Sequence, residues 1–279
     1  MKAKKKPHGI KQKIREEKKR QQHIVFTLAI LIAVISVSGF VANSMLNQAT
    51  NPAYQFKAAI IDQLSLKYPN QTFIEAATNT LKQANYTVVD YYSGENVTVE
   101  FYRNLPTHGY GLIILRAHST TGGYPSVAFF TSELYSNSKY INEQLTDKVV
   151  PVAYSPEDAE RGEGYFGITQ SFVKSSMKGR FANTVVVMMG CESLNNTLMA
   201  KAFTEKGAKV YIGWNTLVLA SYTDNAITHL LRHFLIEKLT LIEAVRQTYR
   251  EVGPDPAYNS LLIYYPIEAG EQTIENIER

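Results

Sequence analysis

Two short runs of apolar residues constrain the fold of this chain more than any other feature. Residues 110–117 read YGLIILRA, and residues 183–189 read NTVVVMM. Strands that are apolar at nearly every position must be covered on both faces, as the central strands of a parallel sheet are. The sequence therefore predicts an α/β domain in which these two runs are central strands.

The pattern between residues 58 and 265 favours the same class. We expect further strands at 58–62, 86–92, 165–169, 209–213 and 261–265, and helices at 71–84, 97–104, 194–206, 224–239 and 241–252. Strands that alternate with amphipathic helices predict a mostly parallel central sheet with helices on both faces. The stretch from Ser119 to Gly179 is less regular, with a hairpin expected around residues 126–130.

A third apolar run lies near the amino terminus. Residues 24–42 contain no charged residue, and a helix needs roughly 20 residues to cross a bilayer. Ten basic and two acidic residues precede this run, so that segment carries 10 − 2 = +8. The positive-inside rule then predicts a single transmembrane helix, with the amino terminus in the cytoplasm and the rest of the chain outside. A cleaved signal peptide is the alternative, but Phe40 to Asn43 is a poor cleavage site.

These features predict five consecutive parts. They are a basic cytoplasmic segment at 1–23, a transmembrane helix at 24–42 that contacts the lipid bilayer, a linker at 43–56, an extracytoplasmic domain at 57–266 and a polar tail at 267–279. The formal net charge is +4, so the chain after the basic segment carries 4 − 8 = −4, and we expect no nucleic acid among its partners. Four Asn-x-Ser/Thr sequences are possible glycosylation sites in that compartment: Asn70, Asn85, Asn96 and Asn195.

Reactive side chains follow both central runs. His118 comes directly after the first run, and Cys191, the one cysteine of the chain, comes just after the second. The carboxyl ends of neighbouring parallel strands open onto the same edge of a sheet, so the two side chains are expected to meet there as base and nucleophile. A helix that starts close behind Cys191 would favour its thiolate, whereas the adjacent Glu192 would oppose it.

The segments LRAHS and MMGCES, together with the order of strands and helices, resemble the caspase-like superfamily of cysteine peptidases, clan CD, which includes gingipains, clostripain, legumain, separase and metacaspases. The resemblance covers residues 58–265. It implies a three-layer caspase-like fold and a cysteine endopeptidase that acts on peptide or protein substrates without a cofactor. Cys191 would be the nucleophile, His118 the general acid/base, and the backbone N–H groups of Ser119 and Cys191 the oxyanion site.

The resemblance also suggests substrate-binding residues. Gly213, Trp214 and Asn215 follow the next strand and would line the cleft and pair with an extended peptide. Met189 stands two positions before Cys191, where relatives that cut after Arg or Lys often carry an acidic residue. Met189 therefore gives no support for a preference for a basic residue before the cleaved bond. Asp224 or Glu192 could supply the negative charge that such a preference requires.

Other interpretations stay open. The same fold could be an inactive surface-binding module with a buried, unreactive Cys191, or a transpeptidase or ligase that uses the same thioester. His229 and His233 have the i, i+4 spacing of zinc ligands, which would suit a zinc-dependent hydrolase. However, Leu230 occupies the position of the metalloprotease glutamate, and both histidines are predicted on the solvated helix face, so we expect no metal site. His108 precedes its strand and is expected at the opposite edge of the sheet.

Overall fold

The computed structural model describes residues 56–278 with the exception of 123 and 125. The predicted cytoplasmic segment at 1–23, the predicted transmembrane helix at 24–42 and all but the last residue of the linker at 43–56 lie outside the described residues. In the part of the chain that is described, no helix has the length and apolar character needed to cross a bilayer.

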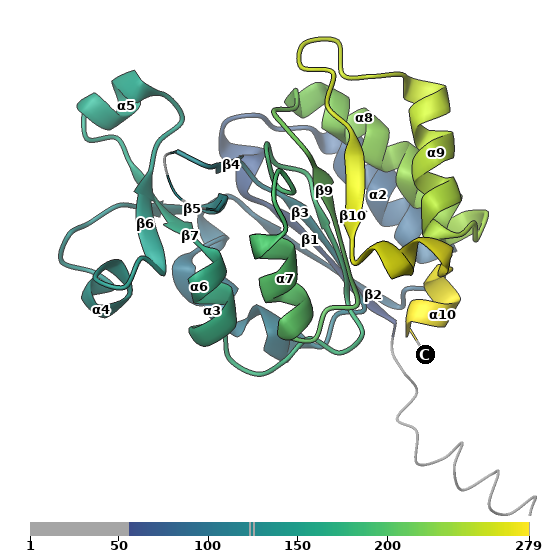
Figure 1. Ribbon diagram of the computed structural model, residues 1–279, viewed down its shortest axis with the longest axis horizontal. Coiled ribbons are helices and arrows are strands. Elements are labelled where there is room, and N and C mark those ends of the chain that lie inside the picture. Colours follow the sequence, from purple (N-terminus) through teal and green to yellow (C-terminus); the bar gives the residue numbers. More distant parts are fainter. Residues whose placement is uncertain (1–55, 123, 125, 279) are drawn as a thin grey trace, which may run out of the picture. The chain divides into compact units, whose positions relative to one another are not determined.

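A six-stranded sheet forms the centre of the described domain, in the order β10-β9-β8-β3-β1-β2 (Figure 1). Its strands are β1 (Lys57–Asp62), β2 (Val88–Ser93), β3 (Leu112–Arg116), β8 (Val185–Met188), β9 (Val210–Trp214) and β10 (Leu262–Tyr265). Every neighbouring pair is parallel except β9 and β10, which are antiparallel. The predicted α/β class and mostly parallel sheet are confirmed, and the two apolar runs are the adjacent central strands β3 and β8.

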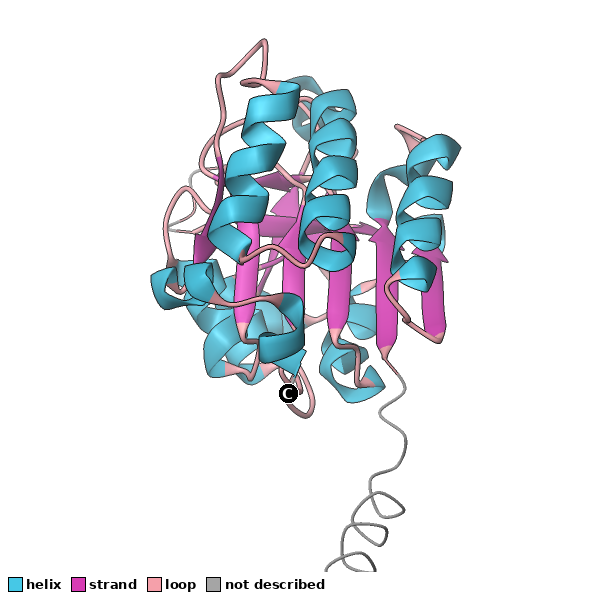
Figure 2. Cartoon of the chain, turned by 90° about the vertical axis from the view of Figure 1, so that its right-hand side faces the viewer, coloured by secondary structure: helices cyan, strands magenta, loops and turns pink. Residues whose placement is uncertain are grey.

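Helices cover both faces of this sheet (Figure 2). One face packs against α2 (Gln71–Gln83), α8 (Ala220–Leu231) and α9 (Leu241–Val252), and the other against α3 (Val99–Asn104), α6 (Gln170–Ser175) and α7 (Leu198–Glu205). Successive residues of a strand point to opposite faces, so Ile60 and Ile114 belong to the first core, whereas Ile61 and Ile113 belong to the second. This coverage explains why β1, β3 and β8 lack polar alternation.

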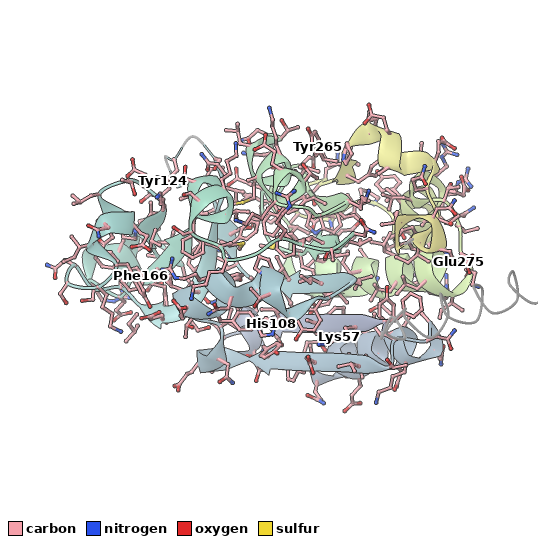
Figure 3. The ribbon with its side chains drawn as sticks, turned by 90° about the horizontal axis from the view of Figure 1, so that it is seen from below. Lys57, His108, Tyr124, Phe166, Tyr265 and Glu275 are labelled. Atoms are coloured by element: carbon pink, nitrogen blue, oxygen red, sulfur yellow. The ribbon has the colours of Figure 1, made fainter. Side chains whose placement is uncertain are left out.

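A second, antiparallel sheet occupies the stretch whose pattern was least regular. Its order is β4-β5-β7-β6, with β4 (Ser119–Thr120), β5 (Ala128–Leu134), β6 (Val149–Val152) and β7 (Tyr165–Ile168). The short helices α4 (Ile141–Gln144) and α5 (Pro156–Glu160) flank it. Figure 3 shows Phe166 and Tyr124 at this end of the domain, with Glu275 at the opposite end. Because β4 follows His118 directly, the small sheet begins at the edge where the candidate site is expected.

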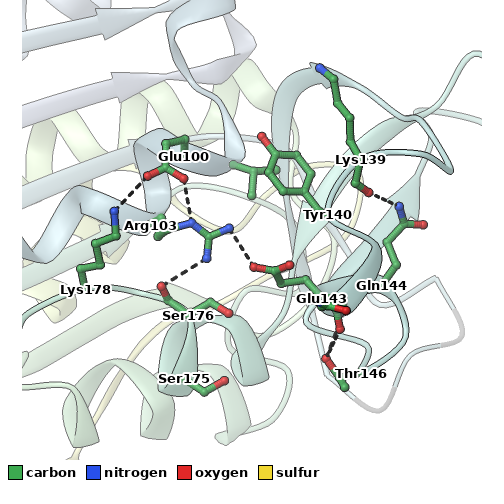
Figure 4. A network of polar contacts seen from close by, with 12 residues as sticks. Glu100, Arg103, Lys139, Tyr140, Glu143, Gln144, Thr146, Ser175, Ser176 and Lys178 are labelled. Atoms are coloured by element: carbon green, nitrogen blue, oxygen red, sulfur yellow. Dashed lines mark hydrogen bonds and ion pairs between the residues drawn. The ribbon is translucent and has the colours of Figure 1, made fainter.

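A polar network joins the small-sheet region to the helical layer (Figure 4). Arg103 of α3 forms ion pairs with Glu100, at 2.7 Å, and with Glu143 of α4, at 2.9 Å. The same guanidinium donates to the carbonyl of Ser176, and Lys178 pairs with Glu100 at 3.2 Å. The pairs are partly exposed, so their main effect is to fix the orientation of α4 rather than to add much stability.

The chain after β10 packs against the domain instead of forming a polar tail. Residues Ile267–Glu271 form a 3₁₀ helix and Ile274–Glu278 form α10. Ala269, Ile274 and Ile277 are buried in the same core as α9. The prediction of a polar tail at 267–279 is therefore wrong for its described part. Ile274 and Ile277 lie one helical turn apart and form an apolar face too short to stand out among charged neighbours.

Candidate active site

The register of the sheet brings His118 and Cys191 to the same edge. In the parallel pair β3 and β8, Leu115 is the partner of Met188. His118 lies 118 − 115 = 3 residues after Leu115, and Cys191 lies 191 − 188 = 3 residues after Met188. The two segments therefore leave the sheet at the same level. His118 and Cys191 both line one cavity of about 740 Å³.

Close backbone packing holds the two strand ends together. Ser119 Oγ donates a hydrogen bond to the carbonyl of Cys191 at 2.5 Å. Between the strand ends lies Gly190, where a Cβ would stand only 2.3 Å from Ser119 Oγ and 2.5 Å from the carbonyl oxygen of Ala117. A glycine is thus required at 190 because any side chain would separate the loop that carries the histidine from the loop that carries the cysteine.

His118 is held by stacking and by its backbone. Its ring stacks on Tyr154 with centroids 5.1 Å apart and meets the edge of Phe130 at 4.6 Å. Its backbone N–H donates to Gln63 Oε1 at 3.0 Å, and the amide of Gln63 donates in turn to the Tyr154 hydroxyl at 2.8 Å. Among the described residues, its ring nitrogens have no hydrogen-bond partner. The imidazole is therefore fixed in place, yet its nitrogens are free to exchange protons with a ligand.

Burial lowers the pKa of His118 to about 4, with a smaller contribution from the positive charge of Lys67. Lys67 Nζ lies 3.9 Å from the centre of the Tyr154 ring, on which the imidazole stacks. A cation in this setting loses hydration and is repelled by a second cation nearby. At neutral pH the imidazole is consequently uncharged and can accept a proton.

Cys191 is partly buried, and the segment after β9 passes directly over its sulfur. The thiol donates to the carbonyl of Val218, and the N–H of Val218 lies at the same distance from Sγ, 3.5 Å. Burial raises the pKa of the thiol, and the negative charges of Glu192 and Asp255 raise it further. The hydrogen bond from the N–H of Val218 lowers this pKa, but by less than burial raises it. Within the described chain no hydrogen bond joins Sγ to the His118 ring, so the two groups are neighbours in a cavity rather than a bonded pair.

The expectation that a helix dipole favours the thiolate is wrong. The predicted helix at 194–206 is shorter in the structure, because α7 begins at Leu198 and residues 191–197 form turns. The helix therefore starts 198 − 191 = 7 residues after the cysteine. The effect of a helix terminus falls off within about one turn, so Cys191 receives little of it.

The backbone N–H of Ser119 is not used by the small sheet. The peptide bond between His118 and Ser119 is trans, and the carbonyl of His118 accepts from the N–H of Phe130 on β5. Because the C=O and N–H of a trans peptide point in opposite directions, the Ser119 N–H points away from β5. The N–H of Cys191 lies close enough to its own sulfur to lower the thiol pKa. The role of both N–H groups as oxyanion donors stays a prediction.

Asp224 lies outside the cavity and is held by a buried arginine. Arg116, which is 1% exposed, donates to both carboxylate oxygens of Asp224 and to Asp62, all at 2.8 Å. Asn70 Nδ2 also donates to Asp224 at 2.8 Å. Burial raises the pKa of Asp62, although Arg116 opposes this shift. Asp224 therefore supplies no charge for a substrate, and the network instead anchors the strand end that leads to His118.

Gly213, Trp214 and Asn215 also fail to line the cavity. Trp214 is 1% exposed, its N–H donates to Ser193 Oγ, and its indole donates to Thr223. The N–H of Asn215 donates to the carbonyl of Leu261, which extends the pairing of β9 with β10. A Cβ at Gly213 would stand 2.6 Å from Ser193 Oγ. The expectation that this segment pairs with a peptide is wrong, because its backbone already has partners.

The cavity wall on this side comes from residues further along the chain. Leu217, Val218 and Leu219 line the cavity, and Met189 lines it beside Cys191. The opposite wall belongs to the small-sheet region and includes Pro151 and Tyr154. A loop that lies beyond a strand leaves no periodic signal, so sequence reasoning could identify the strand that precedes it but not the wall itself.

The carboxylate of Glu192 is hydrogen-bonded to the loop that follows β4. Its carboxylate accepts from the N–H of Thr121 at 3.2 Å and from the hydroxyl of the same residue at 3.0 Å. Its own N–H donates to the carbonyl of Thr216. Glu192 thus braces the small sheet against the cysteine loop and does not line the cavity.

His229 and His233 converge on Glu251 of α9. Single ligand atoms of the three residues lie within 4.8 Å of one another, which is a spacing that could hold a metal ion. An Arg232 nitrogen donates to Glu251 and lies 3.1 Å from His233 Nε2, so a side-chain cation already occupies this position. Hydrogen bonds from His229, His233 and Arg232 lower the pKa of Glu251 to about 2.

The prediction of a solvated face for both histidines is wrong for His233, which is 3% exposed. Residues Arg232–Ile236 form a π-helical turn at the end of α8. His233 lies within this wider turn, which departs from the regular α-helical register on which the prediction was based. His108 precedes β3 and, as expected, does not line the cavity. Its ring stacks on that of Tyr110.

Three of the four possible glycosylation sites are exposed, namely Asn85, Asn96 and Asn195. Asn70 differs, because its Oδ1 caps α2 through the N–H of Phe73 and its Nδ2 bonds Asp224. A sugar on Nδ2 would have to fit beside Asp224, and Asn70 is the least exposed of the four.

No protein-family model matches the chain, and no curated protein matches it significantly.

Proposed function

We propose that this chain is a membrane-anchored, extracytoplasmic cysteine endopeptidase with a caspase-like fold. The observation that carries the proposal is the matched exit of His118 and Cys191 from neighbouring parallel strands into one cavity. The helices on both faces of the mostly parallel sheet support the caspase-like architecture that the residues around these two positions suggest.

The chemistry follows from the protonation states of the two groups. Cys191 rests as a thiol because its pKa is raised, and His118 rests as a neutral imidazole because its pKa is lowered. When a peptide carbonyl reaches Sγ, the thiol proton passes to the imidazole as the carbon–sulfur bond forms. The resulting oxyanion accepts hydrogen bonds from the N–H groups of Ser119 and Cys191.

His118 then returns the proton to the leaving amine, the carbon–nitrogen bond breaks, and a thioester remains on Cys191. Water attacks this thioester, gives one proton through His118 to the departing sulfur and releases the new carboxylic acid. An amine in place of water would give transpeptidation by the same route, so product analysis separates hydrolase from ligase.

The test is cleavage of an end-blocked peptide library by the full chain and by Cys191→Ala. We expect turnover in the wild type and none in the variant, with unchanged circular dichroism. His118→Ala should lose activity as well, whereas His108→Ala, which alters a histidine outside the cavity, should keep it. Equal turnover in Cys191→Ala would refute the proposal, and an inert thiol with no turnover in the wild type would favour a binding module.

The membrane anchor is proposed at residues 24–42, on the strength of their apolar length and the basic segment before them. The full chain is expected to stay with membranes after alkaline carbonate extraction and to be protected from external protease only at its amino terminus. Release by carbonate would contradict the anchor while leaving the peptidase proposal standing.

A further inference from the structure

The cavity beside Cys191 is lined by apolar and hydroxyl-bearing residues and contains no fixed charge. Among the described residues that line it there is no Asp, Glu, Lys or Arg, and His118 is the one residue whose side chain readily titrates near neutrality. Burial keeps that imidazole neutral at pH 7. A side chain that enters this cavity therefore meets no opposite charge.

The acidic groups nearest the sulfur are already satisfied by the protein. Glu192 is bound by Thr121. Asp255 is 2% exposed and accepts from the N–H groups of Leu219, Ala257 and Tyr258. Each carboxylate would have to give up these hydrogen bonds to reach a substrate cation, which costs free energy.

The nearest cation is also paired. Lys67 lies over the ring of Tyr154, on which His118 stacks, and forms an ion pair with Asp158 at 3.8 Å. An acidic substrate side chain in the cavity would compete with Asp158 for this cation. The position gives no preference for an anion.

The wall next to the sulfur is aliphatic. Val218 contacts Sγ through its backbone, so its neighbours Leu217 and Leu219 lie close to the position of the scissile bond. Met189, two residues before the cysteine, also lines the cavity. The side chain that precedes the cleaved bond is attached one carbon away from the carbonyl that Sγ attacks, and we place it against this wall.

We propose that this site cleaves peptides after an uncharged apolar residue such as Leu or Phe. The inference rests on the proposed peptidase function and adds its specificity. A charged side chain at this position would lose hydration without gaining a partner of opposite charge, whereas an apolar one gains from leaving water. We expect kcat/KM for Leu or Phe to exceed that for Arg or Asp by at least about 100-fold.

The experiment uses the full chain and four end-blocked peptides that differ only in Leu, Phe, Arg or Asp before the scissile bond. The matched variants are Leu217→Asp, which places a carboxylate in the cavity wall, and Leu198→Asp, which changes an equally exposed leucine outside the cavity (41% and 40%). Leu217→Asp should shift the Leu-to-Arg ratio of kcat/KM by about 10-fold or more toward Arg. Leu198→Asp should leave the ratio unchanged.

The outcomes separate the specificity from the function. Cys191-dependent cleavage after Arg or Asp that equals cleavage after Leu would overturn the apolar preference and leave the peptidase standing. An equal shift of the ratio in both leucine variants would also overturn the assigned wall. The absence of Cys191-dependent cleavage of every peptide would remove the peptidase proposal itself.

Discussion

Replacing Gly190 with alanine tests how tightly the two candidate catalytic loops are packed. The added Cβ would stand 2.5 Å from the carbonyl oxygen of Ala117, whereas Cβ atoms in proteins essentially never approach closer than 3.0 Å. The backbone at Ala117 must therefore move by at least 3.0 − 2.5 = 0.5 Å. Ser119 Oγ, at 2.3 Å, must also give up its position, and with it the hydrogen bond to Cys191.

Overpacking of this kind costs about 1 to 3 kcal/mol when side chains can adjust, and the obstacle here is backbone, so we expect a loss of about 3 kcal/mol in the free energy of unfolding. Movement of the histidine loop away from the cysteine should in addition lower kcat/KM by about 100-fold, because small misplacements of catalytic groups are costly.

The matched control is Gly164→Ala. The nearest atoms to a Cβ at that position are 3.5 and 3.6 Å away, an ordinary contact distance. Its unfolding free energy should stay within about 0.5 kcal/mol of the wild type. The assay is urea unfolding of the purified full chain, followed by peptide turnover at matched folded fractions. Equal stability and equal activity of the two variants would refute the account of how the loops are packed.

Four further predictions follow from the electrostatics of the site and of the buried network beside it. With the pKa of His118 at about 4, kcat/KM should fall on the acid side near pH 4 rather than near 6.5, and a limb at 6.5 would contradict the burial argument. The pKa of His118 is near 6.5 in the unfolded chain and about 4 in the folded one. The contribution of this difference to stability, about 3 kcal/mol, is therefore complete above pH 6.5 and is lost as the pH falls through 4. In urea titrations, His118→Gln should remove this pH dependence of the free energy of unfolding. Alkylation of Cys191 by iodoacetamide should have a midpoint above pH 9, because burial raises the thiol pKa, and a midpoint below 9 would contradict the raised value. Asp224→Asn should lower the unfolding free energy by about 3 to 5 kcal/mol because it leaves Arg116 partly unpaired, whereas the exposed Glu205→Gln should cost under about 1 kcal/mol; similar losses would show that the network is not buried in solution.

The sequence was sufficient for the central sheet and for the position of the two reactive side chains. Uniformly apolar strands must be buried on both faces, and strands that are parallel neighbours must end at the same edge. These two rules placed His118 and Cys191 together without any knowledge of the distance between them along the chain. The six-stranded order and the cavity that both residues line agree with that reasoning.

The surroundings of the site could not be predicted, because they depend on contacts between distant segments. Asp224 is 224 − 116 = 108 positions from Arg116, and nothing in either segment indicates that they pair. The one available signal was the charged Arg116 inside an apolar strand, which requires a buried partner. The direction of the thiol pKa shift could not be predicted either, since it depends on burial, on the true start of α7 and on Val218, a residue of a loop without periodicity.

The most direct test of the central claim is to trap the acyl group on the enzyme. The full chain is mixed with the peptide that it cleaves fastest, quenched in acid within milliseconds to seconds, digested and examined by mass spectrometry. We predict that the acyl half of the substrate is found on Cys191, that hydroxylamine removes it, and that it is absent in Cys191→Ala. Continued cleavage with no adduct on Cys191, and with full turnover in Cys191→Ala, would contradict the account.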